Sequence, residues 1–238
     1  MITFSLLKSE ILDLLFPPIC AKCQKEGKFL CNLCEKSLIR VPPKCFGCGK
    51  LSPGTRRIPQ GRTCLSCRDK TYIYAFISPF LYREEPVREL IHNLKYMRVY
   101  AISNVLAKLL YTYMQYFTIL FPKNSVIIPM PLHSRRERTR GFNQSLLIAK
   151  SLADTLDIPI CSGVLRRTIN TKPQIEFRAA ERRQNIIGAF SVTLPEKIKN
   201  KTVILLDDVK TTGSTLEEAA RVLKDAGAKK IWAITIAH

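Results

Sequence analysis

The sequence is 238 residues long, with a formal net charge of +19, 46% hydrophobic residues and nine cysteines. This length and apolar content exclude a disordered chain and allow one sizeable α/β core plus a small accessory module. No stretch approaches the ~18 consecutive apolar residues that a membrane-spanning helix needs, so we expect no membrane span.

Residues 1–17 are predicted to form an amphipathic helix rather than a secretion signal. Lys8, Glu10 and Asp13 interrupt the apolar stretch, and no small-residue cleavage site follows it. Two adjacent prolines then end the helix. We therefore expect a cytoplasmic protein.

Residues 18–70 form a cysteine module with four C-x-x-C pairs. The pairs are Cys20/Cys23, Cys31/Cys34, Cys45/Cys48 and Cys64/Cys67. Two pairs supply the four thiolates of a tetrahedral zinc site, so the module predicts two structural zinc ions. We expect the first pair to join the second and the third to join the fourth, with a cross-braced pairing as the alternative. Disulfides are disfavoured because no secretion signal is present.

Zinc would leave the chain strongly basic, since eight thiolates and two Zn²⁺ lower the formal charge from +19 only to about +15. The ninth cysteine, Cys161, stands alone in an apolar segment and is predicted to be buried in the core.

From residue 71 onward, strand and helix patterns alternate. Residues 71–82 carry the alternating aromatic and branched side chains of a hairpin or an edge strand. Helices are predicted at 87–96, 101–117, 145–156 and 216–226, and strands at 125–129, 160–165, 203–206 and 231–237, with an irregular basic region before residue 200. This alternation predicts a mostly parallel sheet flanked by helices. We expect two domains, residues 1–70 and 71–238.

The segment VILLDDVKTTGST, residues 203–215, predicts a strand–loop–helix site for a sugar phosphate. An apolar strand ends in two carboxylates, and a hydroxyl-rich run with one glycine leads into a helix. The residues after the strand are Asp207, Asp208, Val209, Lys210, Thr211, Thr212, Gly213, Ser214 and Thr215. A helix N-terminus offers N–H donors and a partial positive charge to a phosphate. The two aspartates would repel a phosphate and instead suit ribose hydroxyls or Mg²⁺.

This segment resembles the phosphoribosyl-diphosphate (PRPP) loop of the type I phosphoribosyltransferases, a hydrophobic strand followed by two acidic residues and T-T-G-x-T. The wider chain is similar to the ComF (ComFC/GntX) competence proteins in residues 128–133 and 138–144. Further matching positions are Leu165, Arg166, Arg167, Thr171, Gln174, Arg182, Asn185, Ala189 and Phe190. A cysteine-rich module before the phosphoribosyltransferase domain completes the resemblance.

The resemblance implies a type I phosphoribosyltransferase fold with a small N-terminal double zinc ribbon, a PRPP ligand with Mg²⁺, and a role in DNA uptake beside other uptake proteins such as a helicase. Asp207 and Asp208 would hold the ribose, and Thr211 to Thr215 the 5′-phosphate. Met130 and Pro131 would lie in the pyrophosphate loop. Lys95 is a candidate pyrophosphate ligand or, alternatively, an exposed helix lysine.

The arginines admit two interpretations. They would neutralise a departing pyrophosphate, or they would bind single-stranded DNA together with aromatic side chains. The candidates are Arg135, Arg138, Arg140, Arg178 and Arg182. His133 is either a general base or a loop residue.

The leading hypothesis is a PRPP-binding protein that handles single-stranded DNA. The alternatives are an active phosphoribosyltransferase of unknown acceptor, for which the sequence offers no acceptor site, and a regulator that senses PRPP without catalysis.

Overall fold

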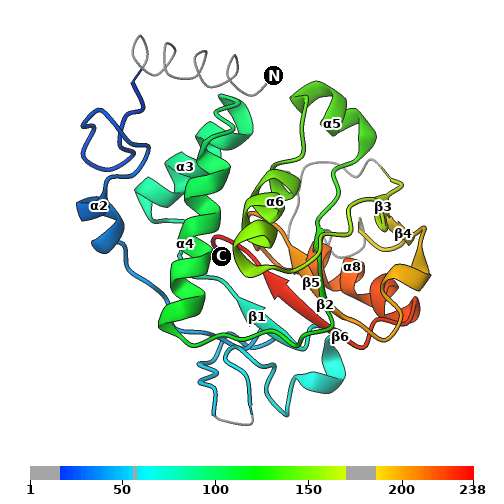
Figure 1. The fold of residues 1–238 in the computed structure, drawn as a ribbon. Helices are drawn as coiled ribbons and strands as arrows, with labels where there is room; N and C mark the ends of the chain where they lie inside the picture. Colours follow the sequence, from blue (N-terminus) through cyan, green and yellow to red (C-terminus); the bar gives the residue numbers. More distant parts are fainter. Residues whose placement is uncertain (1–16, 56–57, 170–185) are drawn as a thin grey trace.

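The computed structural model describes residues 17–55, 58–169 and 186–238 (Figure 1). The helix predicted over residues 1–17 therefore lies outside the described residues except for its last position. Arg178 and Arg182 also lie outside them.

A four-stranded, fully parallel sheet forms the centre of the fold, with the strand order β1-β6-β5-β2. The strands are β1 (Ala75–Ile77), β2 (Ser125–Pro129), β5 (Thr202–Leu206) and β6 (Lys230–Ile234). Every residue of β2 and β5 is buried, as expected for branched apolar strands covered on both faces. The predicted parallel sheet is confirmed, and the segment around β1 is an edge strand rather than a hairpin.

Helices cover both faces of this sheet (Figure 1). The covering helices are α3 (Glu85–Tyr96), α4 (Ile102–Tyr116), α6 (Gln144–Leu156) and α8 (Ser214–Asp225), whereas α5 (Ser134–Arg140) buries no residue. Alternate residues of β5 point to opposite layers because side chains alternate along a strand. Ile204 and Leu206 pack with α3, α4 and α6, whereas Val203 and Leu205 pack with α8. Among the described residues, no helix has the length and apolarity to cross a membrane.

Four features differ from the sequence prediction. The exposed helix α5 was not predicted, and neither was the antiparallel pair formed by β3 (Leu165–Arg167) and β4 (Phe190–Val192). The strand expected at residues 160–165 is reduced to an isolated bridge between Ile160 and Ile127 and to the first residue of β3. Cys161 is half-buried at the edge of an apolar cluster rather than buried within it.

The cysteine module packs directly on the α/β part. Its first half includes the short helix α2 (Asn32–Lys36) and contributes Leu30 and Leu38 to the layer of α3 and α4. The Tyr113 hydroxyl of α4 donates a 2.7 Å hydrogen bond to the carbonyl oxygen of Val41. Phe46, in its second half, joins the apolar layer of α8 instead. The two halves of the module therefore contact opposite layers of the fold.

Candidate functional site

The eight clustered cysteines form two tetrads. Their members are Cys20, Cys23, Cys31 and Cys34 in the first and Cys45, Cys48, Cys64 and Cys67 in the second, and the sulfurs of each tetrad lie within 4.8 Å of one another. Sulfur–sulfur distances of 3.6 to 3.8 Å match a tetrahedron with Zn–S bonds of about 2.3 Å. Each tetrad thus has the ligand set of a structural zinc site, and the predicted pairing in sequence order is confirmed.

The pKa values of two thiols in the second tetrad shift in opposite directions. The Ser66 hydroxyl, with help from Cys67, lowers the pKa of Cys64 to about 6. The pKa of Cys67 is raised to about 12, first by the hydrogen bond between Cys67 and Cys64 and second by burial of the Cys67 thiol. Four crowded thiols cannot all ionise without a cation between them. A divalent metal would supply that charge.

The predicted phosphate loop lies at the carboxyl edge of the sheet, between β5 and α8. Asp207 and Asp208 directly follow β5, and Gly213 is the N-cap of α8 with a φ of 84°. Helix α8 begins at Ser214, two residues earlier than predicted. Since the first turn of a helix has N–H groups without intrahelical acceptors, this edge suits an anion.

The two aspartates have opposite electrostatic environments. Burial beside Asp208 raises the pKa of Asp207 to about 7. Burial would also raise the pKa of Asp208, but an ion pair with the Lys95 ammonium holds it below its usual range. Lys95 belongs to α3, and its side chain is 18% exposed. The structure thus places Lys95 beside the ribose end of the predicted site, and its role as a pyrophosphate ligand stays a prediction.

The N-terminus of α6 supports the aspartates from a second element. The Ser145 hydroxyl donates a 3.0 Å hydrogen bond to Oδ1 of Asp207. Asn143 caps α6 by accepting from the Ser145 and Leu146 amides, and its own Nδ2 donates to the Met130 carbonyl oxygen. Ser145 was not predicted as a site residue, because its position in the sequence is that of an ordinary residue in the first turn of a helix. The capping pattern beginning at Asn143 was the signal that could have found it.

The second tetrad reaches the phosphate loop through Phe46. A cavity of about 450 Å³ lies between them. It is lined by Phe46, Gly47, Cys67, Lys70, Thr71, Ile186, Ile187, Thr212, Gly213, Ser214, Glu217 and Glu218. Glu217 of α8 accepts hydrogen bonds from the Thr71 hydroxyl and the Tyr72 amide, which fixes the end of the cysteine module against α8.

Lys210, a residue of the loop, packs on two aromatic rings that lie outside the loop. Its ammonium lies 5.1 Å from the ring centre of Phe46 and 5.4 Å from that of Phe76. Burial lowers the pKa of Lys210. Val209 forms a parallel bridge with Ala237, so the loop backbone is joined to the C-terminal segment. These contacts fix the loop, and direct ligand contacts of Val209, Lys210, Thr211, Thr212, Ser214 and Thr215 stay predictions.

The second predicted loop follows β2. Met130 is buried and its amide donates to the Leu206 carbonyl oxygen, whereas Pro131 is only half-buried. His133 is the N-cap of α5, and its Nδ1 accepts from the Arg135 amide. This capping contact agrees with the interpretation of His133 as a loop residue, and its role as a general base stays a prediction.

The predicted arginines of α5 divide into exposed and tethered ones. Arg135 and Arg138 are exposed. Arg140 donates a 2.6 Å hydrogen bond to Gln144 and lies over the Tyr96 ring. Burial and the charge of Arg136 lower the pKa of Arg167, on β3, to about 10, while the charge of Asp207 opposes that shift.

Comparison with known proteins agrees with this geometry. A family model described as the phosphoribosyl transferase domain matches residues 143–238, from the N-cap of α6 to the end of the chain. Competence protein F of Haemophilus influenzae is 32% identical over 218 residues, covering 90% of this chain and 87% of that protein. DNA utilization protein YhgH of Escherichia coli K12 is 30% identical over 215 residues, covering 86% and 89%. Competence protein ComFC of Bacillus subtilis is 36% identical over 112 residues, covering 47% and 43%.

Proposed function

Because this chain belongs to the family of competence protein F and carries a type I phosphoribosyltransferase fold, we propose that it binds PRPP with Mg²⁺ and handles single-stranded DNA during DNA uptake. The observation that supports PRPP most directly is the paired Asp207 and Asp208 at the end of β5, beside the N-terminus of α8. One ligand with hydroxyls at one end and a phosphate at the other would satisfy both features.

The donor set fits such a ligand. Asp207 accepts from Ser145 and from the Asp208 amide on the same oxygen, Oδ1, so its carboxylate is oriented before a ligand arrives. The aspartates would accept hydrogen bonds from ribose hydroxyls or hold Mg²⁺ through water. Mg²⁺ would supply charge to neutralise the diphosphate. The first turn of α8 would hold the 5′-phosphate.

Lys95 has a defined part in this proposal. Its ammonium neutralises Asp208 without ligand, which lowers the cost of holding two carboxylates together. A PRPP diphosphate near Asp208 would offer the same ammonium a second anionic partner.

The DNA part of the proposal rests on charge and on the relatives. Relatives over most of the chain are named for competence and for DNA utilization. The formal charge of +19 far exceeds what one sugar diphosphate requires. Eight of the nine cysteines form metal-type tetrads rather than disulfides, which supports action in the reducing cytoplasm.

Catalysis is the second candidate function, favoured by the electrostatic interaction between Arg167 and Asp207, since a leaving diphosphate beside that aspartate would need positive charge. One experiment tests both candidates. PRPP binding is measured by calorimetry, and pyrophosphate release is followed with ammonia and with nucleobases, each with and without single-stranded DNA. PRPP binding is the expected result, and acceptor-dependent release would assign a transferase. Absence of PRPP binding would overturn the proposal.

A further inference from the structure

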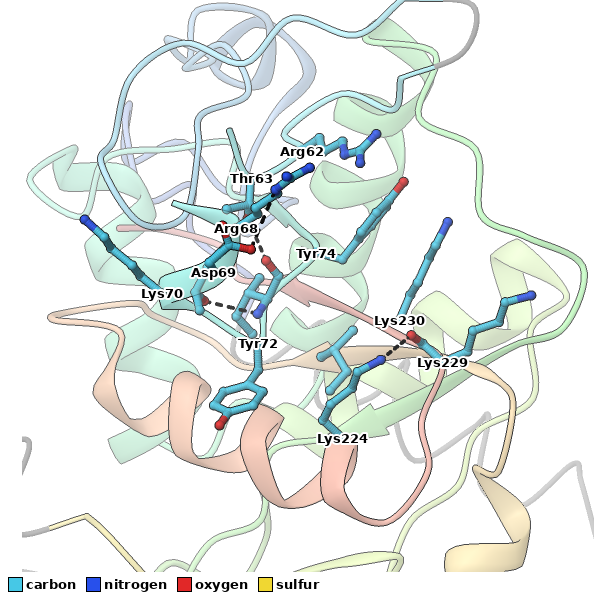
Figure 2. A pocket seen from close by; sticks show the side chains of 13 residues that line it. Arg62, Thr63, Arg68, Asp69, Lys70, Tyr72, Tyr74, Lys224, Lys229 and Lys230 are labelled. Atoms are coloured by element: carbon cyan, nitrogen blue, oxygen red, sulfur yellow. Dashed lines mark hydrogen bonds and ion pairs between the residues drawn. The ribbon is translucent and has the colours of Figure 1, made fainter. Parts of the chain in front are cut away.

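A second cavity, of about 530 Å³, lies between the cysteine module and the far end of α8 (Figure 2). Its walls come from residues on both sides of the fourth cysteine pair, from residues 71–74, and from the end of α8 together with the start of β6. We call it the lysine–tyrosine groove. The basic residues that line it are Arg62, Arg68, Lys70, Lys224, Lys229 and Lys230, and the tyrosines are Tyr72 and Tyr74.

The groove shares Lys70 and Thr71 with the first cavity but lies away from the aspartates of the predicted PRPP site. Lys230 is the first residue of β6 and pairs in register with Thr202 at the start of β5. Asp207 follows the opposite end of that strand, five residues away at about 3.3 Å per residue, or roughly 16 Å. A single sugar diphosphate cannot occupy both places.

The positive charge of the groove is largely uncompensated. Asp69 is its one acidic lining residue, and it lies 3.6 Å from Arg68. Among the residues that the structure describes, no ion pair neutralises Lys70, Lys229 or Lys230. The Lys229 amide donates to the Lys201 carbonyl oxygen, so the basic surface continues beyond the groove. A bare cluster of like charges costs stability, which favours a polyanionic ligand there.

Aromatic rings are placed among these charges. The Lys230 ammonium lies 4.4 Å from the ring centre of Tyr74, and the Arg62 guanidinium lies 5.1 Å from it. Figure 2 shows these three side chains projecting side by side, with Tyr72 on the side of α8. Tyr72 is 45% exposed. Cations that hold phosphates next to exposed rings that stack bases are the combination by which proteins bind single strands.

We propose that the lysine–tyrosine groove is the single-stranded DNA site of this protein, with phosphates on Lys229, Lys230 and Arg62 and a base stacked on Tyr72. This inference deepens the proposed function and rests on it. An acidic peptide or an anionic membrane would use the charge but would leave the rings without a role.

The test measures fluorescence anisotropy of a labelled oligothymidylate of about 20 nucleotides, longer than the 4–16 nucleotides that single-strand modules cover. The zinc-loaded full chain is compared with Lys229→Gln/Lys230→Gln and, separately, with Tyr72→Ala. Each lost phosphate contact removes about 0.7 from the logarithmic salt slope, so the double variant should bind at least about tenfold more weakly at 0.1 M salt. Tyr72→Ala should cost about fivefold or more because it removes one stacking platform.

Two comparisons make the result decisive. Arg88→Gln/Lys150→Gln removes two exposed charges on α3 and α6 and should leave DNA affinity within about twofold. Arg135→Gln/Arg138→Gln tests the α5 surface. Equal losses in the groove and control variants, or a loss confined to α5, would overturn the groove assignment. So would groove variants that lose binding to anionic phospholipid vesicles while keeping DNA affinity.

PRPP calorimetry on the same variants separates the two levels of the proposal. Groove variants should bind PRPP normally, which also shows that they are folded. If the wild-type chain binds no single-stranded DNA, the DNA part of the proposed function fails. If it binds and the groove variants bind equally well, only the groove assignment fails.

Discussion

Phe46 lies directly over Gly213, so a zinc-site loop closes on the predicted phosphate loop. A Cβ built at Gly213 would lie 2.9 Å from the ring carbon Cζ of Phe46, closer than real contacts allow. The two residues are far apart in sequence, and together with Cys67 of the second tetrad they line one wall of the cavity at the predicted phosphate loop.

Gly213→Ala should therefore disturb the loop in two ways. The alanine would have to adopt a φ of 84° and displace Phe46, at a combined cost of about 2–3 kcal/mol in unfolding free energy. Urea unfolding measures this loss, and PRPP affinity should fall with it. Gly227→Ala is the matched control, because Gly227 also has a positive φ but its nearest neighbour is 3.5 Å away. Equal losses in both variants would mean that the Phe46 contact contributes nothing.

Metal analysis should find about two zinc ions per chain, one for each tetrad. Cys64→Ser should lower the content to about one and weaken PRPP binding, because Phe46 and Thr71 then lose their fixed positions. Cys23→Ser should also remove one zinc, yet leave PRPP affinity nearly unchanged, since its tetrad contacts the opposite layer. One zinc or none in the wild-type chain would refute the two-site assignment.

Substituting each aspartate by asparagine should change stability in opposite directions at pH 7.5. The folded-state pKa of Asp207 is raised to about 7, so its ionisation destabilises the fold as pH rises from about 4 to 7. Asp207→Asn should remove that loss and be neutral or stabilising. Asp208→Asn leaves Lys95 buried without its carboxylate and should cost about 3 kcal/mol.

Urea unfolding of both variants from pH 4 to 8 checks these signs. The pKa of Asp208 is lowered by Lys95, so its stabilisation is present above its unfolded pKa and disappears as pH falls through its folded pKa. The cost of Asp208→Asn should shrink on acidification. Identical pH profiles for the two variants would contradict the division of roles between the aspartates.

The affinity of the wild-type chain for single-stranded DNA should fall steeply with salt. A logarithmic slope of about −2 or steeper corresponds to three or more phosphate contacts, as the basic groove requires. Anisotropy titrations between about 50 and 300 mM salt, where counterion release dominates, measure this slope. A flat profile would show that the basic surface does not contact the strand.

Sequence patterns predicted the parts of this protein whose chemistry is local. Strand β2 and the Asp207–Asp208 edge of β5 follow from buried apolar runs, and the cysteine tetrads from C-x-x-C spacing. Helix α5 was missed because it buries no residue and so carries no apolar periodicity. Strand β4 was missed because three residues are too few to establish an alternation.

Contacts between distant segments could not be predicted. Lys95 on α3 and Ser145 on α6 reach the aspartates only after the sheet brings their elements to one edge. Phe46 reaches Gly213 for the same reason. The side chains proposed to bind the ligand could be named in advance, whereas the side chains that position them depend on the fold.

Calorimetry of Asp207→Asn/Asp208→Asn with PRPP and Mg²⁺ determines whether the edge formed by Asp207 and Asp208 binds PRPP. Circular dichroism and zinc content establish that the variant is folded. We predict that its affinity for PRPP falls at least about a hundredfold, since two carboxylates that accept ribose hydrogen bonds are lost. A folded variant that binds PRPP as tightly as the wild-type chain would contradict the assignment.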